Sequence, residues 1–291
     1  TFTELAQRLA AKGRVEDVAG LIVKQPDGSA TRTAPRPVVQ DLDSLPLPDR
    51  SADSARFYNV MGTEDVVATI VTSRGCPFRC TFCSTPREHY RERSAQSVVD
   101  EMAACVEQGI KEIYFVDDTF NVNPARVSQL CDLILERQMQ VKWSCRLRID
   151  RTTRGMLESM RAAGCTRVQY GVETSADAGL DALGKGITVA QVREVIGWTR
   201  QAGIPAVAYY MIGCPHERTR ADVLRTIRFA CDLDTDMAMF NVLTPMPGSK
   251  LHADGVARGV LTEDCWEEFF VHPTAEFRPE VWEEHLSRGE L

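Results

Sequence analysis

The segment that constrains this chain most strongly reads Thr72-Ser73-Arg74-Gly75-Cys76-Pro77-Phe78-Arg79-Cys80-Thr81-Phe82-Cys83. It spaces three cysteines as C-x3-C-x2-C and so puts three thiolates on one short loop. Four thiolates normally saturate a four-iron cluster. A cluster held by Cys76, Cys80 and Cys83 would therefore keep one iron open to a substrate or a cofactor.

Two other kinds of site use closely spaced cysteines. A structural zinc ion needs a fourth cysteine or histidine nearby, and His89 is the local candidate. A disulfide framework belongs to short secreted chains, whereas this chain has 291 residues and ten cysteines without a pairing pattern. The spacing therefore favours a three-thiolate iron–sulfur site.

The composition narrows the class of protein. With 44% hydrophobic residues the chain can bury one large core or two modest ones. A net charge of -7 disfavours a general nucleic-acid surface. No apolar run approaches the ~20 residues that span a bilayer, and no signal peptide is visible. Because the remaining cysteines show no pairing pattern, we expect a reducing compartment, the cytoplasm.

The chain divides into three regions that differ in their predicted secondary structure. Residues 1–65 predict a helix from Phe2, a hairpin around Pro26-Asp27-Gly28, and a proline-rich linker. Residues 66–250 form the main repeating region. Residues 251–291 predict a C-terminal extension with one or two short helices, within 266–270 and 282–286. Since both ends look cut, we expect a fragment of a longer polypeptide, with 1–65 as the end of an upstream domain.

The main region alternates apolar strands with helical windows. The predicted strands are 67–71, 113–116, 141–144, 167–170, 206–210 and 238–243. Helix signals separate them: Asn123-Pro124 is an N-cap followed by proline, and Gly109, Gly164 and Gly203 each end a helix. Right-handed crossovers between six parallel strands predict an α/β fold, an open (β/α)6 partial TIM barrel. In such barrels the chemistry lies at the carboxyl ends of the strands.

The cysteine loop, with Phe82 just before the last cysteine, resembles the signature of radical S-adenosylmethionine (SAM) enzymes. The resemblance implies that Cys76, Cys80 and Cys83 hold a [4Fe-4S] cluster and that the amine and carboxylate of SAM chelate the fourth iron. Reductive cleavage of the sulfonium would then give a 5′-deoxyadenosyl radical. Phe82 is implied to lie near the adenine.

The strand ends supply candidate SAM contacts. Two adjacent carboxylates, Asp117 and Asp118, are costly at a barrel mouth unless they meet a cation, and we expect Asp118 to face the SAM ammonium. Capping of the following turn is the alternative. We expect the third strand to continue from Trp143 through Asp150. Arg148, near the end of this strand, could bind the SAM carboxylate with two hydrogen bonds or pair with Asp150.

The fourth strand ends in the run Gly171-Val172-Glu173-Thr174-Ser175. Gly171 allows close backbone approach, and Glu173 at the rim could accept both ribose hydroxyls. The run resembles the ribose-binding strand of the radical SAM branch that includes cobalamin-dependent and methylthiotransferase enzymes. The resemblance therefore also implies Ser175 as a cofactor contact.

Two later strand ends complete the set. Cys214, after the fifth strand, is a weak catalytic candidate as a hydrogen donor or nucleophile. The alternative is that its thiol packs in the core as a small buried hydrophobic side chain. Thr244-Pro245-Met246-Pro247-Gly248 resembles a closing loop of the same branch, with Met246 lining the adenine.

Three functions remain open at this point. The first is a radical SAM enzyme that performs cobalamin-linked methylation, or a related modification, of an unactivated carbon in a small molecule. It would take cobalamin through an upstream domain and electrons from a flavodoxin or ferredoxin. The second is a methylthiotransferase acting on RNA or protein, which would need a further three-cysteine cluster. The third is a non-catalytic electron-transfer domain, which full cysteine ligation would suit better.

Overall fold

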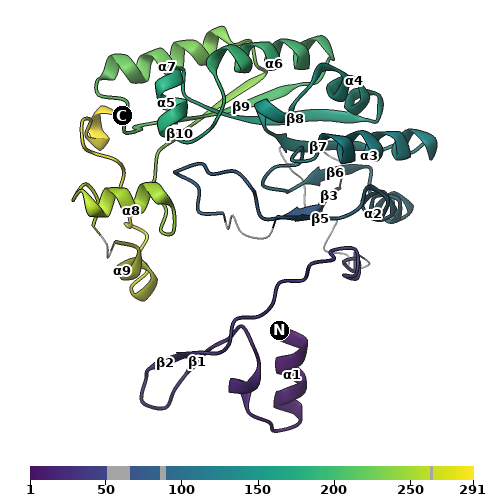
Figure 1. Cartoon of the computed structure of the whole chain (residues 1–291), viewed down its shortest axis with the longest axis vertical. Helices are drawn as coiled ribbons and strands as arrows, with labels where there is room; N and C mark the ends of the chain where they lie inside the picture. The colour runs from purple at the N-terminus through teal and green to yellow at the C-terminus, as the bar shows by residue number, and fades with distance from the viewer. Residues whose placement is uncertain (51–65, 86–89, 263–264) are drawn as a thin grey trace. The chain divides into compact units, whose positions relative to one another are not determined.

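The computed structural model describes residues 1–50, 66–85, 90–262 and 265–291 (Figure 1). It divides into two compact units, residues 1–41 and 42–291. The first unit contains helix α1 (Phe2–Ala10), a 3-10 turn (Val15–Asp17) and an antiparallel hairpin of β1 (Ile22–Lys24) and β2 (Ala30–Arg32). The predicted helix and hairpin are therefore confirmed.

A six-stranded sheet organises the second unit. Its strands run in the order β10-β9-β8-β7-β6-β3, and every neighbouring pair is parallel. The strands are β3 (Val67–Ile70), β6 (Glu112–Phe115), β7 (Lys142–Leu147), β8 (Cys165–Glu173), β9 (Ala206–Ile212) and β10 (Met237–Val242). The prediction of six parallel strands is confirmed. A short antiparallel pair, β4 (Ser73–Arg74) with β5 (Arg91–Glu92), flanks the cysteine loop.

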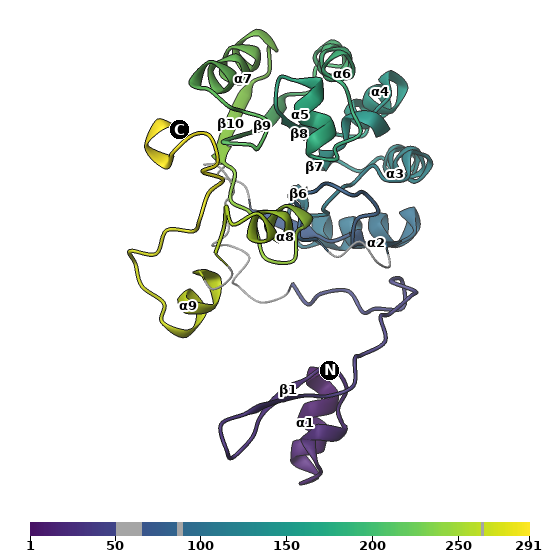
Figure 2. The same ribbon diagram turned by 60° about the vertical axis from the view of Figure 1, so that its left-hand side comes forward.

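Helices cover the outer face of this sheet. Figure 2 shows α2, α3, α4, α6 and α7 in an arc around it. The helices of this unit are α2 (Ala95–Glu107), α3 (Pro124–Glu136), α4 (Arg154–Ala162), α5 (Asp177–Ala182), α6 (Val189–Gln201), α7 (Arg220–Asp232), α8 (Lys250–Ala257) and α9 (Cys265–Val271). Since strands and helices alternate and β3 and β10 lie at opposite edges, the sheet is the open (β/α)6 barrel that the sequence predicts.

The helix boundaries follow the predicted local signals. Asn123 caps α3, with Pro124 at its first position, because the Asn123 side chain accepts the amide hydrogen of Arg126. Gly164, which ends α4, has a φ of 91°, and a Cβ there would lie 2.2 Å from the carbonyl oxygen of Val141. Only glycine satisfies both conditions without strain.

Three aromatic rings pack against one another in the hydrophobic core of this unit. The ring centres of Phe115 and Phe120 lie 4.7 Å apart, and those of Phe115 and Trp143 lie 5.6 Å apart. All three side chains are fully buried. The indole Nε1 of Trp143 donates to the carbonyl of Ala163 at 2.8 Å, so the cluster buries its polar atom with a partner.

The third strand is shorter than predicted. We expected it to continue through Asp150, but β7 ends at Leu147 and Ile149–Arg151 form a 3-10 turn. The reason is a side chain from another segment: Asn121 accepts the amide hydrogen of Arg148 and donates to its carbonyl. This takes Arg148 out of the strand pairing and sets its position at the rim.

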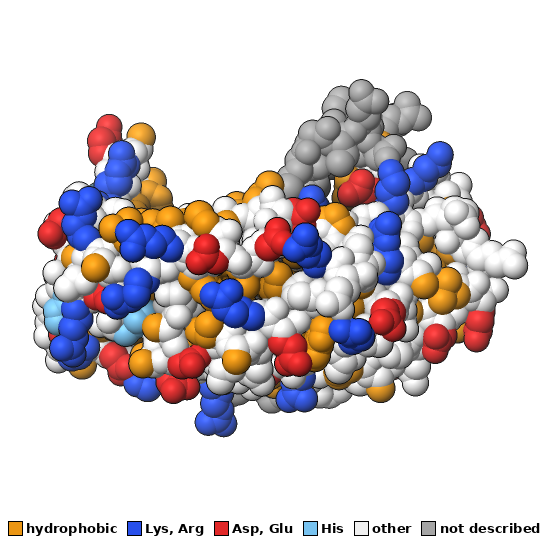
Figure 3. Space-filling view, turned by 90° about the horizontal axis from the view of Figure 1, so that it is seen from above, with side chains coloured by type: hydrophobic (Ala, Val, Ile, Leu, Met, Phe, Trp, Pro, Cys, Tyr) orange, Lys and Arg blue, Asp and Glu red, His pale blue; other side chains and the backbone are white. Residues whose placement is uncertain are grey.

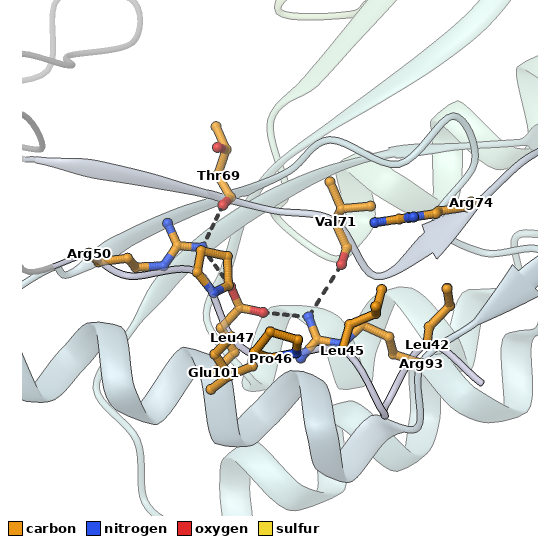
Figure 4. A pocket seen from close by; sticks show the side chains of 11 residues that line it. Leu42, Leu45, Pro46, Leu47, Arg50, Thr69, Val71, Arg74, Arg93 and Glu101 are labelled. Atoms are coloured by element: carbon orange, nitrogen blue, oxygen red, sulfur yellow. Dashed lines mark hydrogen bonds and ion pairs between the residues drawn. The ribbon is translucent and has the colours of Figure 1, made fainter. Parts of the chain in front are cut away.

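The edge strand β3 is protected by a buried ion network (Figure 4). Arg50 donates to the carbonyl of Thr69 at 2.9 Å, and Arg93 donates to the carbonyl of Val71 at 3.3 Å. Both arginines pair with Glu101, which is almost fully buried. Two carbonyls of an exposed strand edge are thereby satisfied, which hinders pairing with another chain. Part of the proline-rich linker (42–50) lines the same cavity of ≈ 340 Å³.

Among its described residues, the C-terminal segment contains one short α-helix where one or two helices were predicted, so that prediction is confirmed. Helix α9 (Cys265–Val271) covers the first predicted position, and in the described structure 282–286 is not helical. Instead Trp282 packs with Leu251, Leu183 and Leu243 in a small apolar cluster. Burial of these side chains decides the path of the chain there, because helix propensity is a weak preference that packing overrides.

Acidic and basic side chains are interspersed on the helix-covered face in Figure 3. The described residues of this face therefore form no large patch of positive or negative charge. Within the described ranges, no helix is both long enough and apolar enough to cross a membrane.

Candidate active site

The three cysteines line one cavity at the carboxyl ends of the strands. Cys80 is buried, and Cys76 and Cys83 are half-buried. The cavity measures ≈ 350 Å³, and its wall is formed by Cys76, Cys80, Phe82, Cys83, Thr85, Asp118, Thr119, Arg146, Leu147, Arg148, Gln169, Gly171, Glu173, Lys185 and Tyr209. Four of the six cofactor contacts predicted from the sequence thus face the same space as the thiols: Phe82, Asp118, Arg148 and Glu173.

Polar groups lie against each of the three sulfur atoms. Arg148 Nη1 donates to Cys80 Sγ at 3.7 Å, and the amide of Thr85 donates to Cys83 Sγ at 3.4 Å. The hydroxyl of Thr119 lies 3.7 Å from Cys76 Sγ. Iron-bound thiolates accept hydrogen bonds of this kind, and such bonds tune the cluster potential. The three thiols and their surroundings therefore fit an iron–sulfur cluster.

The zinc alternative depends on His89, which lies outside the described residues. Among the residues that are described, no three histidine, cysteine, aspartate or glutamate side chains are grouped as ligands of a single metal ion.

The segment after α5 supports the cysteine loop. Thr81 donates its amide hydrogen to the carbonyl of Leu183 at 2.9 Å and its hydroxyl hydrogen to that of Ala182 at 3.2 Å. Gly184 has a φ of 64°, and a Cβ there would come within 2.7 Å of the carbonyl oxygen of Arg79. The backbone of the loop is therefore held from outside, before any cofactor is considered.

Arg148 is buried and makes several contacts. Its Nε donates to Asp150 at 2.8 Å, and its Nη2 donates to the carbonyl of Lys185 at 2.6 Å. The guanidinium carbon lies 3.7 Å from the ring centre of Phe78. Of the two roles left open by the sequence, the ion pair with Asp150 is the one present in this structure. Arg148 thus joins the cysteine loop to the segment after α5.

The two adjacent aspartates occupy different environments. Asp117 is buried and accepts the amide hydrogens of Thr72 and Ser73 at 2.8 and 2.7 Å. Burial raises the pKa of Asp117, while these hydrogen bonds and Arg126 oppose the shift. Asp118 points the other way and lines the cavity. Asp117 thus fixes the backbone, and Asp118 lines the cavity, where its contact with the SAM ammonium stays a prediction.

Glu173 lies beside a cation that the sequence analysis missed. Lys185 Nζ is 2.5 Å from Glu173 Oε1, and both side chains are nearly buried. Glu173 has a φ of 70° next to a register shift in β8, a strained conformation for a residue with a side chain. A Cβ on Gly171 would lie 2.2 Å from Glu173 Oε1 and 2.6 Å from Lys185 Nζ. Gly171 therefore makes room for the ion pair.

The inner wall of the cavity is rich in hydrogen-bond donors. The hydroxyls of Tyr114 and Tyr209 both donate to Gln169 Oε1, at 3.3 and 3.0 Å. Arg146 lies over the ring of Tyr114 and forms no ion pair with any described residue. These four residues lie on β6, β7, β8 and β9 at alternating inward positions, a signal that was present in the sequence.

Three predicted site residues lie elsewhere. Ser175 hydrogen-bonds Thr226 at 3.3 Å, and Met246 is partly exposed. Cys214 is buried in the apolar cluster around Leu251, its thiol 3.8 Å from the carbonyl of Met211, and burial raises its pKa well above the ordinary value. None of the three belongs to the cavity wall built by the described residues.

A polar network supports the end of β8 from behind. Thr174 Oγ1 lies 3.1 Å from His216 Nε2, and the buried His216 Nδ1 has no partner among the described atoms. Burial lowers the pKa of His216. The adjacent Glu217 accepts the amide hydrogen of Cys214 at 2.9 Å, and burial raises its pKa. The network holds the residue that follows Glu173.

Comparison with known proteins identifies the family. The sequence profile of the Radical SAM superfamily matches residues 70–230, more than half of the chain. The chain belongs to the radical SAM superfamily. Membership implies a [4Fe-4S] cluster and SAM as cofactors, and the three thiols at the cavity fit that expectation. Radical SAM enzymes also need a reductant.

Curated relatives support the same placement. The chain is 32% identical over 273 residues to an uncharacterized methyltransferase of Pyrococcus horikoshii, covering 92% of this chain and 59% of the relative. It is 30% identical over 279 residues to an anaerobic magnesium-protoporphyrin IX monomethyl ester cyclase of Rubrivivax gelatinosus, covering 94% and 49%. The chain thus spans about half the length of these relatives.

Solved structures share the fold. The radical SAM methyltransferase TsrM from Kitasatospora setae, solved with cobalamin and a [4Fe-4S] cluster, superimposes with a TM-score of 0.72. Its sequence is 20% identical, and the match covers 88% of this chain and 52% of that one. This likeness confirms the partial barrel.

Proposed function

We propose that this chain is the catalytic core of an enzyme that cleaves SAM reductively and uses the radical for cobalamin-linked methylation, or a related modification, of an unactivated carbon in a small molecule. The observation that carries the proposal is the shared cavity: three thiols, an aromatic ring and two carboxylates face one space. A bound cluster would supply the electron that breaks the sulfonium carbon–sulfur bond.

Different residues around the cavity bind different parts of SAM. Phe82 offers an apolar face to the adenine, and Glu173 offers carboxylate oxygens to the ribose hydroxyls. Asp118 is placed to neutralise the methionyl ammonium. Lys185 and Arg146 supply positive charge for the carboxylate, since the guanidinium of Arg148 already contacts Asp150 and Cys80. Ser175 and Met246 remain predictions for a ligand-bound state.

Names of similar proteins support the methylation step. A hopanoid C-3 methylase of Methylococcus capsulatus is 26% identical over 253 residues, which cover 85% of this chain. Together with the methyltransferase of Pyrococcus horikoshii and the cobalamin-bound TsrM, it favours carbon methylation over electron transfer alone. We propose that cobalamin binds through a domain outside the radical SAM core, and that a flavodoxin or ferredoxin supplies the electron.

The methylthiotransferase alternative needs a second three-cysteine cluster, and the described residues form no such group outside the loop. Of the seven cysteines beyond the loop, five are buried in the described structure (Cys105, Cys131, Cys145, Cys165 and Cys214), and of these Cys145 lies against Cys165. Burial raises the pKa of the Cys131 thiol to about 12 and that of Cys145 well above its ordinary value. Such thiols are poor sources of the thiolates that a cluster needs.

The test is anaerobic reconstitution of the chain with iron and sulfide, one-electron reduction with dithionite, and then electron paramagnetic resonance with and without SAM. We expect one [4Fe-4S] signal that SAM shifts, and release of 5′-deoxyadenosine after reduction with dithionite. Cys80→Ala should lose the cluster, whereas Glu173→Gln should keep it and weaken SAM binding about 10-fold. A signal indifferent to SAM would refute the proposal.

A further inference from the structure

One buried arginine contacts both ends of the cysteine loop. Arg126, near the start of α3, is only 4% exposed. Its Nη1 donates to the carbonyl of Thr72 at 3.4 Å and to that of Arg93 at 3.3 Å, and its Nη2 donates to the hydroxyl of Thr72 at 3.0 Å. Thr72 precedes the three cysteines in the chain, and Arg93 follows them. The segment that carries the thiols is therefore held at both ends by one side chain.

Carboxylates balance the charge of Arg126 and contact the same segment. The hydroxyl of Thr72 donates to Asp117 Oδ2 at 2.6 Å while it accepts from Arg126, so it joins the two charged groups. Glu92 Oε2 lies 3.4 Å from Arg126 Nε, and Asn123 donates to Glu92 Oε1 at 2.7 Å. A buried guanidinium needs such partners, because an unpaired charge in the interior is costly. The charge of Arg126 is thus compensated within the protein.

The same guanidinium reaches the segment that contacts the first cysteine. Arg126 Nη2 also donates to the carbonyl of Phe120 at 3.3 Å. The preceding residue, Thr119, has its hydroxyl 3.7 Å from Cys76 Sγ. Arg126 does not line the cavity formed by the described residues, so it acts on the cysteines through these backbone contacts. A lysine would not make the same set of contacts, because one ammonium cannot donate in the fixed directions of a planar guanidinium.

We propose that Arg126 is a positioning residue for the iron–sulfur cluster, which fixes both ends of the loop so that three thiols converge on one metal site. The inference rests on the proposed function, because the loop needs this fixed position only if it holds the cluster. Bringing three thiols together costs conformational entropy, and fixing the ends of the loop in advance removes part of that cost. Loosening of the ends should therefore speed the loss of iron from Cys76, Cys80 and Cys83.

The test measures how fast the reconstituted cluster loses iron to the chelator ferrozine under anaerobic conditions. Arg126→Lys keeps a positive charge beside Asp117 and Glu92 but removes the planar fork. We expect its iron release to be about 10-fold faster than that of the parent. Arg93→Lys is the matched control, since Arg93 is also buried, pairs with Glu101, and keeps the carbonyl that accepts from Arg126. It should release iron at the parent rate.

Hydrogen exchange gives a readout that needs no cluster. Mass spectrometry of the unreconstituted chain should show faster exchange of the amides in residues 72–83 in Arg126→Lys, and parent exchange there in Arg93→Lys. Circular dichroism checks that each variant folds. If Arg126→Lys does not fold, Thr72→Val takes its place, because it removes the hydroxyl between Arg126 and Asp117. Its iron release should be about 3-fold faster than that of the parent.

Three results would overturn the proposal. The first is iron release and exchange at the parent rate in the variant that folds. The second is equal acceleration in Arg93→Lys, which would make Arg126 one contributor to general stability among others. The third is failure of both Arg126→Lys and Thr72→Val to fold, because the contacts would then serve the whole fold. Failure of the proposed function has a different outcome: the parent would retain its iron but release no 5′-deoxyadenosine when reduced with SAM.

Discussion

The aromatic core behind the sheet and the rim of the cavity in front of it are both buried, yet they are built in opposite ways. Phe115, Phe120 and Trp143 pack ring against ring, with the indole hydrogen satisfied. At the rim, Glu173 and Lys185 are charged side chains beside a strained backbone. Buried ion pairs contribute little net stability, whereas apolar packing contributes much. The comparison therefore separates residues that hold the fold from residues that serve a ligand.

The largest effect is expected in the core. Trp143→Ala removes a fully buried ring and its hydrogen bond, so it should lower the free energy of unfolding by about 3–5 kcal/mol. Urea denaturation followed by circular dichroism measures the change. Phe270→Ala is the control, because Phe270 is 79% exposed and should cost less than about 0.5 kcal/mol. Similar losses in both variants would break the distinction between core and surface.

A change at the rim should affect binding more than stability. Gly171→Ala puts a methyl group where Glu173 Oε1 and Lys185 Nζ now lie, so it should displace the ion pair. We expect SAM affinity of the reconstituted chain to fall about 10-fold, while the free energy of unfolding changes by no more than about 1 kcal/mol. Calorimetry with SAM and urea titration measure the two quantities.

The matched control for that variant lies in a helix. A methyl group added at Gly197 on α6 would meet no atom of the described residues within 4 Å. Gly197→Ala should therefore stabilise the helix by up to about 1 kcal/mol and leave SAM affinity unchanged. If Gly171→Ala lowers the free energy of unfolding by several kcal/mol but leaves the SAM affinity of the folded chain unchanged, Gly171 serves the stability of the fold and not the binding of SAM.

The smallest effect is a dependence on pH. Burial lowers the pKa of His216, so as pH falls the unfolded chain takes up this proton before the folded chain does. Stability from this group is therefore complete above the unfolded pKa and decreases as the pH falls below about 6.5. His216→Gln should flatten that part of the pH profile, measured by urea denaturation across the range. An unchanged slope would show that His216 does not contribute to it.

The fold was largely predictable because its signals are local. Apolar runs and capping residues such as Asn123 predicted six strands and the helices between them, and the structure confirms them. The predicted end of β7 was wrong, because Asn121 reaches it from a different segment. Of the one or two C-terminal helices that the sequence left open, the structure forms one, because Trp282 packs into a cluster whose members come from distant positions.

The candidate site was only partly predictable. The thiols, Asp118 and Glu173 follow strands, and parallel strands bring their carboxyl ends to one edge. Lys185 lies between two glycines in a loop, where no periodic pattern marks its partner. Its pairing with Glu173 requires the chain to return from α5 to the rim, and sequence spacing does not encode that return.

Sequence alone determined the three-thiolate loop, the family and the parallel barrel, because cysteine spacing and hydrophobic periodicity act over a few residues. The tertiary structure decided which charged side chains form ion pairs and contacts. It placed Arg148 between Phe78 and Cys80, paired Lys185 with Glu173, and buried Cys214 away from the cavity. These outcomes depend on contacts between distant segments, since the interaction of two charges is set by their separation and burial in space.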